Sequence, residues 1–174
     1  SDKMDGFKEL DGGGDTGYTK TDFMTKLRYS FSESHALEFK YSITDELSDE
    51  TYLGLTDADY SENPLRRYRA TALDEMDADH SQVMLSYAAK LNENMSLAIV
   101  GYSNDFARNW YKLNKVNGAK LSTISKDPTT DGFDAFYALM DTQNSADDAY
   151  RIKANNREYY SSGIQAVLNV NAGA

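Results

Sequence analysis

Apolar and polar residues alternate along several stretches of this chain, and this period of two constrains the fold more than any other feature. Successive side chains of a β-strand point to opposite faces of a sheet, so alternation predicts strands that are apolar on one face only. By this criterion strands lie near residues 18–31, 35–44, 79–91, 95–111 and 160–172. We therefore expect an all-β fold built from about five or six antiparallel strands.

The two faces of these predicted strands carry different chemistry. One face is apolar or aromatic, with Phe23, Leu27, Phe39, Tyr41, Leu85 and Leu97. The other face is polar and charged, with Lys20, Asp22, Lys26, Arg28, Glu38 and Lys40. Met24 and Val167 depart from the pattern, and the alternation blurs after Gly101, so the register beyond that point stays open.

The connections between the predicted strands are strongly unequal. Residues 32–34 and 92–94 form short turns, whereas residues 45–76 and 112–159 form long, polar and acidic loops. Short periplasmic turns and long extracellular loops are typical of outer-membrane β-barrels, whose apolar face meets lipid. The pattern therefore favours a transmembrane β-barrel over a soluble β-sandwich. Because such barrels have at least about eight strands, we expect this chain to be part of a larger barrel.

The composition excludes several classes of function. The formal net charge of −10 would repel a phosphate backbone, so we expect no nucleic-acid partner. The chain has no cysteine, and no apolar run approaches the ~18 residues of a membrane helix. It also lacks the motifs of nucleophilic catalysis and of phosphate or dinucleotide binding. We therefore expect no enzyme, no catalytic residue and no cofactor.

Three stretches carry a resemblance to a known family. They are DGFKELDGGGDTGY at residues 5–18, ETYLGLTDADY with NPLRRY at 50–60 and 63–68, and NDFARNWYKL at 104–113. In this order they resemble the TonB-dependent outer-membrane siderophore receptors, in the branch of the ferric dicitrate transporter. The stretch ETYLGLTDADY is the most specific of them, and residues 119–150 take no part in the resemblance.

The resemblance implies a place in the outer membrane of a Gram-negative bacterium, in a barrel of ~22 strands that an N-terminal domain plugs. It also implies import of a ferric chelate, either ferric citrate or another siderophore, driven by the TonB complex. We expect the chain to be a central barrel segment without the plug domain and without the segment that contacts the TonB complex. Its other partners would be outer-membrane lipid and lipopolysaccharide.

Three arginines in the predicted loop 45–76 are candidates for binding the chelate: Arg66, Arg67 and Arg69. A guanidinium pairs with carboxylates through two parallel hydrogen bonds, which suits a carboxylate-rich ligand. The alternative is that the arginines pair with acidic residues of the same loop and shape it. Those residues are Asp59, Glu62, Asp74 and Glu75.

A second candidate group ends the strand predicted at 95–111 and consists of Arg108, Trp110 and Tyr111. Its aromatic rings would stack on the ligand or cap it. The alternative is structural, because Trp and Tyr at the outer end of a barrel strand usually belong to the aromatic girdle at the membrane interface.

Metal binding has little support in the sequence. The acidic residues Asp57, Asp59 and Glu62 offer oxygen ligands, but they lack the glycine turn and the terminal glutamate of an EF-hand loop. The histidines, His35 and His80, fall on different predicted strand pairs and on opposite faces. We therefore expect no metal site.

A competing function from another class also fits the alternation. A soluble all-β binding or adhesion module would recognise a glycan or a protein through its tyrosine-rich loops. Such a module would fold cooperatively in water, whereas a barrel segment would need detergent or lipid, because its apolar face and sheet edges would otherwise be exposed.

Overall fold

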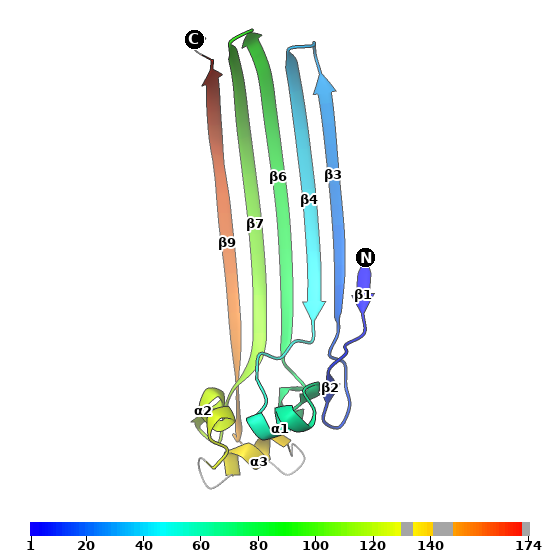
Figure 1. Cartoon of the computed structure of the whole chain (residues 1–174), viewed down its shortest axis with the longest axis vertical. Helices are drawn as coiled ribbons and strands as arrows, with labels where there is room; N and C mark the ends of the chain where they lie inside the picture. Colours follow the sequence, from blue (N-terminus) through cyan, green and yellow to red (C-terminus); the bar gives the residue numbers. More distant parts are fainter. Residues whose placement is uncertain (130–133, 141–147, 172–174) are drawn as a thin grey trace. The chain divides into compact units, whose positions relative to one another are not determined.

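The computed structural model describes residues 1–129, 134–140 and 148–171, and it confirms the predicted all-β fold. Most of the described chain is antiparallel β-sheet, accompanied by short helices (Figure 1). The strands are β1 (Asp2–Met4), β2 (Glu9–Leu10), β3 (Tyr18–Ser30), β4 (His35–Ser48), β5 (Arg66–Arg67), β6 (Glu75–Asn92), β7 (Met95–Val116), β8 (Ala119–Lys120) and β9 (Tyr150–Val170). The helical elements are α1 (Asp57–Glu62), the 3-10 turn η1 (Arg69–Thr71), α2 (Leu121–Lys126) and α3 (Asp134–Met140).

The long strands belong to one sheet. Its order is β1-β3-β4-β6-β7-β8, and β9 also pairs with β7. Neighbouring long strands run in opposite directions, as the arrows in Figure 1 show. A separate parallel pair joins β2 to β5, with Glu9 opposite Arg66. Because the strand order has free ends, the described strands form an open sheet.

The strands are longer than the alternation predicts. β4 continues to Ser48 instead of ending near residue 44, β6 begins at Glu75 instead of 79, and β7 ends at Val116 instead of 111. β9 begins at Tyr150 instead of 160, and its last described strand residue is Val170, since the predicted end at 172 lies outside the described residues. In β9, four consecutive polar residues, Asn155 to Glu158, interrupt the alternation, so the pattern alone places the start of this strand too late.

The chain divides into two compact units. The loop unit comprises Ser1–Lys20, Glu46–Asp77 and Arg108–Asn156, and the sheet unit comprises Thr21–Asp45, Ala78–Ala107 and Arg157–Ala174. The loop unit holds α1, η1, α2 and α3, and the sheet unit holds the turns between β3 and β4 and between β6 and β7.

The loop unit has its own hydrophobic core. In α2 the buried residues Leu121 and Ile124 stand one helical turn apart, so one face of this short helix points inward. In α3, Leu139 is likewise fully buried, and both helices pack with Leu113 of β7. The predicted loops 45–76 and 112–159 are therefore shorter than expected and are folded around shared apolar contacts.

The sheet unit confirms the two-faced pattern of the predicted strands. On the apolar face, the rings of Phe23 and Tyr41 lie 6.5 Å apart. On the polar face, the Lys26 ammonium lies 3.0 Å from the Glu38 carboxylate. Further polar pairs are Thr44 with Asp22 at 2.7 Å, Gln82 with Asn104 at 2.7 Å and Asn169 with Ser96 at 3.4 Å.

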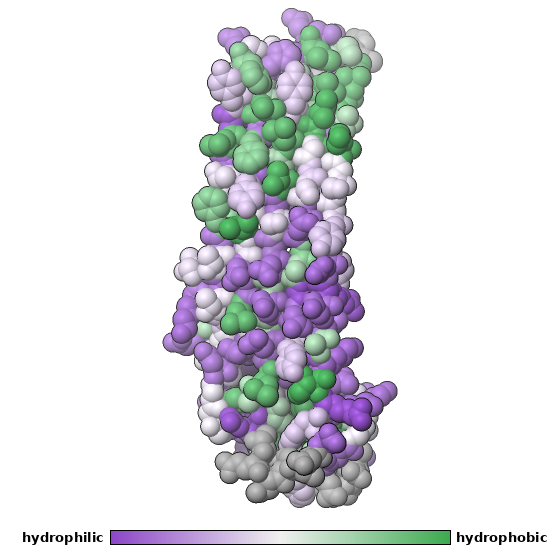
Figure 2. All heavy atoms as spheres, turned by 180° about the vertical axis from the view of Figure 1, so that it is seen from behind, coloured by the Kyte–Doolittle hydropathy of each residue, from purple (hydrophilic) through white to green (hydrophobic). Residues whose placement is uncertain are grey.

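The sheet unit has almost no core of its own. Among the described residues, Ala89 is the single buried hydrophobic residue of this unit, whereas the others belong to the loop unit. Large apolar side chains on β3, β6 and β9 are instead exposed, including Leu27 at 64%, Leu85 at 47% and Ile164 at 82%. Figure 2 shows apolar side chains gathered over the turn-bearing ends of the strands. This single-layered sheet leaves an apolar face uncovered.

Candidate ligand-binding site

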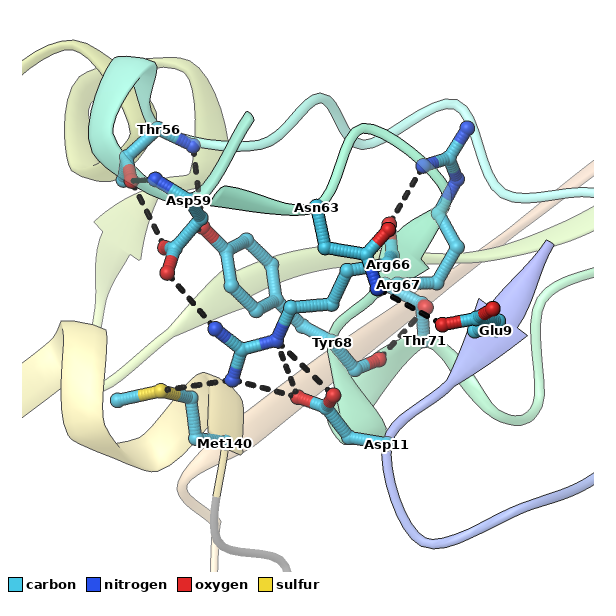
Figure 3. A network of polar contacts seen from close by, with 10 residues as sticks. All are labelled: Glu9, Asp11, Thr56, Asp59, Asn63, Arg66, Arg67, Tyr68, Thr71 and Met140. Carbon is cyan, nitrogen blue, oxygen red and sulfur yellow. Dashed lines mark hydrogen bonds and ion pairs between the residues drawn. The ribbon is translucent and has the colours of Figure 1, made fainter. Parts of the chain in front are cut away.

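Arg66 directs its guanidinium donors to carboxylates within the loop unit (Figure 3). Its Nε donates to Asp11 Oδ1 at 2.9 Å, its Nη2 donates to Asp11 Oδ2 at 2.9 Å, and its Nη1 donates to Asp59 Oδ1 at 2.7 Å. The pair with Asp59 is among those that the sequence predicts, and the pair with Asp11 is not. Arg66 therefore fastens β5 to α1 and to the residue that follows β2.

The second carboxylate oxygen of Asp59, Oδ2, accepts hydrogen bonds from two hydroxyl groups. Thr56 caps α1, and its hydroxyl donates to Asp59 Oδ2 at 2.8 Å, while the Tyr68 hydroxyl donates to the same oxygen at 2.6 Å. Burial alone would raise the pKa of Asp59, but the hydrogen bonds from Tyr68 and Thr56 and the charge of Arg66 together lower it. Asp59 therefore stays ionised as the counterion of Arg66.

Arg67 and Arg69 contact backbone oxygens. Arg67 Nη1 donates to the Arg66 carbonyl at 2.5 Å (Figure 3) and to the Pro64 carbonyl at 3.3 Å. Arg69 Nη1 donates to the Gly13 carbonyl at 2.8 Å. Neither makes an ion pair within the described part of the chain. The three predicted arginines thus do not converge on one site, and Arg66 is the one already neutralised.

A second group of residues combines positive charge with aromatic rings. We call it the cation–aromatic cluster, and it consists of Tyr52, Arg108, Trp110, Lys112 and Lys153. The Lys112 ammonium lies 3.6 Å from the Trp110 ring centroid and 4.0 Å from that of Tyr52. The two rings meet edge to face, with centroids 5.6 Å apart. An ammonium over an aromatic face is attracted by the ring quadrupole.

The charges of the cluster are not balanced by ion pairs. Burial lowers the pKa of Lys112, and the positive charges of Lys153 and Arg108 lower it further, whereas Asp74 opposes this. Across residues 1–129, 134–140 and 148–171, the ion pairs within 4.0 Å include none of Arg108, Lys112 or Lys153. The cluster therefore concentrates positive potential in an acidic chain.

The second predicted group is divided between two sides of β7. Trp110 and Tyr111 are neighbours on a strand, so their side chains point to opposite faces. Trp110 packs against Tyr52 and Lys112, whereas Tyr111 is 41% exposed. Sequence reasoning missed Tyr52, Lys112 and Lys153. The alternation of Arg108, Trp110 and Lys112 was the one signal that would have added Lys112.

Asp74 lies buried beside this cluster. The residue is 3% exposed, and its Oδ1 accepts a hydrogen bond from the Leu113 backbone N–H at 2.7 Å. Burial raises the pKa of Asp74 to about 6, although the Leu113 and Thr51 hydrogen bonds and the Lys112 charge act in the opposite direction. Asp74 is therefore a carboxyl group whose ionisation is disfavoured in the folded loop unit.

The residues considered for metal binding are engaged separately. The His35 Nδ1 lies 2.7 Å from the Tyr87 hydroxyl, and the His80 ring packs edge to face on Phe106. Asp59 forms an ion pair with Arg66. Within the described ranges, no group of three or more acidic or histidine side chains is placed to hold a metal ion.

No described helix has the length and apolar character that crossing a membrane requires. Comparison with protein-family models, with curated proteins and with solved structures finds nothing that matches this chain. The functional proposal therefore rests on the residues and their geometry.

Proposed function

We propose that this chain belongs to the wall and outer loops of a bacterial outer-membrane β-barrel, a TonB-dependent transporter that imports a ferric chelate. The uncovered apolar face of the sheet unit carries this proposal. Moving a large apolar side chain out of water contributes roughly 1.5–3 kcal/mol. A face with many such side chains therefore needs a cover, and lipid acyl chains cover the corresponding face of transmembrane barrels.

The polar face of the same sheet supports this assignment. Hydrogen bonds and ion pairs such as Lys26 with Glu38 join neighbouring strands across that face. A lumen filled with water or with a polar domain accepts such a face, because its charges stay solvated or paired. The two faces together match the alternation of a barrel wall.

An acidic hollow in the sheet unit fits contact with lipopolysaccharide. It has a volume of about 440 Å³ and includes the carboxylates of Asp45, Asp79, Asp105 and Glu158 in its lining. Asp45 lies on β4, Asp79 on β6, Asp105 on β7 and Glu158 on β9. In a barrel wall, such a group of carboxylates would meet lipopolysaccharide phosphates through bridging cations.

The transporter catalyses no reaction in this proposal. The loop unit binds the chelate at the cell surface, with Arg67, Arg69, Arg108 and Trp110 as candidate contacts. Energy from the TonB complex then drives a conformational change that releases the chelate inward. Ferric citrate is the ligand we propose first, and another ferric siderophore is the alternative.

One observation favours the competing function of a soluble glycan- or protein-binding module. The loop unit has a core of its own and exposes Tyr52, Tyr60 and Tyr137 at 42%, 63% and 58%. Such a surface suits recognition by aromatic contacts. A soluble module leaves the uncovered apolar face without a role, which is why we rank it second.

The response of the chain to detergent separates these functions. We expect the chain to aggregate in water and to become monodisperse and rich in β-structure in detergent micelles, because the micelle covers the apolar face. Light scattering after size exclusion and circular dichroism measure both properties. A chain that is monomeric and unfolds cooperatively in water, with no effect of detergent, would contradict the transporter and favour the soluble module.

A further inference from the structure

We propose that Arg108, Lys112 and Lys153 form a binding site for a ligand with several oxyanion groups, seated against the rings of Trp110 and Tyr52. This inference deepens the proposed function. It rests on the proposed function only for the source of the ligand. The existence of the site follows from the geometry of the loop unit. The ligand chemistry is that of carboxylate or phosphate oxygens.

The three cations of this site lack partners among the described carboxylates. The chain has 28 acidic and 18 basic residues, so counterions for a lysine are abundant. Arg66 in the same unit takes two of them, Asp11 and Asp59. Arg108 nevertheless shares a face of β7 with Lys112, and Lys153 lies on the paired strand β9, both near enough for their charges to act on Lys112. None of the three forms an ion pair with a described carboxylate. Like charges held together cost free energy, and an anionic ligand would relieve that cost.

The two aromatic rings fix the position of the Lys112 ammonium. The Lys112 ammonium contacts both Trp110 and Tyr52, and the Tyr52 hydroxyl donates to the Leu113 carbonyl at 3.0 Å. The rings therefore hold the ammonium in place. Lys153 is exposed to solvent, and Arg108 and Lys112 are partly exposed, so a ligand can reach all three. Asp74, the described acid whose charge acts on Lys112, is buried and already accepts the Leu113 N–H.

The chemistry of these cations selects a polyanion. An arginine fork takes two oxygens of one carboxylate or phosphate, and each lysine offers a point charge to further oxygens. A ligand with a single carboxylate can satisfy only part of this set. We therefore expect citrate to bind more tightly than acetate. Citrate and inorganic phosphate distinguish a carboxylate chelate from a phosphate source such as a lipid headgroup.

Trp110 provides a direct readout, because it is the single tryptophan of the chain and contacts the Lys112 ammonium. The experiment titrates the full chain in non-ionic detergent with iron-free citrate, phosphate, acetate and potassium chloride at matched ionic strength. The variants are Lys112→Gln and Lys153→Gln, with Lys120→Gln as a control of equal charge change at an exposed lysine of the loop unit.

We expect a saturable change in Trp110 fluorescence with citrate or phosphate. The affinity of the chain for citrate or phosphate should fall about tenfold or more in Lys112→Gln and Lys153→Gln and stay unchanged in Lys120→Gln. Stronger binding of citrate assigns the site to a chelate, and stronger binding of phosphate assigns it to a phosphate group. A response that potassium chloride reproduces, or an equal loss in Lys120→Gln, would overturn the site. None of these outcomes bears on whether lipid covers the sheet unit, so the site and the transporter proposal can fail separately.

Discussion

Leu113→Ala is expected to reduce the free energy of unfolding of the loop unit by about 3 kcal/mol. The Leu113 side chain is fully buried and packs in the core that β7 shares with α2 and α3. Truncation removes apolar contacts and leaves a cavity that the short helices cannot fill without moving, and both effects lower stability. Urea unfolding followed by Trp110 fluorescence measures the change, because Trp110 lies three residues before Leu113.

Leu73→Ala is the matched control for this substitution. Leu73 belongs to the same unit but is 69% exposed, so its truncation should change the free energy of unfolding by less than about 0.5 kcal/mol. Equal effects of the two substitutions would show that the loops have no specific core. The proposed oxyanion site would then lose its rigid support.

Asp74 is expected to make the loop unit less stable as the pH rises from about 4 to about 7. Its pKa is raised from 3.8 to about 6 in the folded chain, so the folded state binds the proton more tightly than the unfolded state. Below pH 3.8 both states are protonated and the group has no effect; above pH 6 both are ionised and the folded state bears the full cost. That cost is about 3 kcal/mol at most.

Asp74→Asn isolates this contribution. The amide keeps the Oδ1 acceptor for the Leu113 N–H but has no charge. The variant should therefore be more stable than the wild type at pH 7.5 and lose the advantage below pH 4. Other titrating groups, Asp59 among them, are common to both proteins and cancel in the difference. Parallel stability curves for the two proteins between pH 4 and 7.5 would show that Asp74 ionises freely in the folded state.

The sheet unit was largely predictable from the sequence. The period of two assigns Phe23 and Tyr41 to one face and Lys26 and Glu38 to the other, and the contacts between these residues agree. The pattern works because one face is apolar and the other polar along each strand. It fails in β9, where the consecutive polar residues Asn155 to Glu158 interrupt the alternation and backbone pairing continues the strand.

The loop unit was not predictable in the same way. Its contacts join residues far apart in sequence, such as Arg66 with Asp11 across 55 positions, and no local period marks them. Lys153 lies close enough to Lys112 to lower its pKa only because β9 pairs with β7. A single sequence identifies the charges and the rings, and the tertiary fold decides which charges are neutralised.

The most direct test of the central claim asks which face of the sheet meets lipid. The chain has no cysteine, so single cysteines can carry a bimane label in vesicles of brominated lipid. Adjacent positions form matched pairs: Leu27→Cys with Lys26→Cys, Leu85→Cys with Ser86→Cys, and Ile164→Cys with Gln165→Cys. A lipid-facing wall predicts strong quenching at the first member of each pair and weak quenching at the second. Equal quenching within the pairs, or none at Leu27, Leu85 and Ile164, would contradict it.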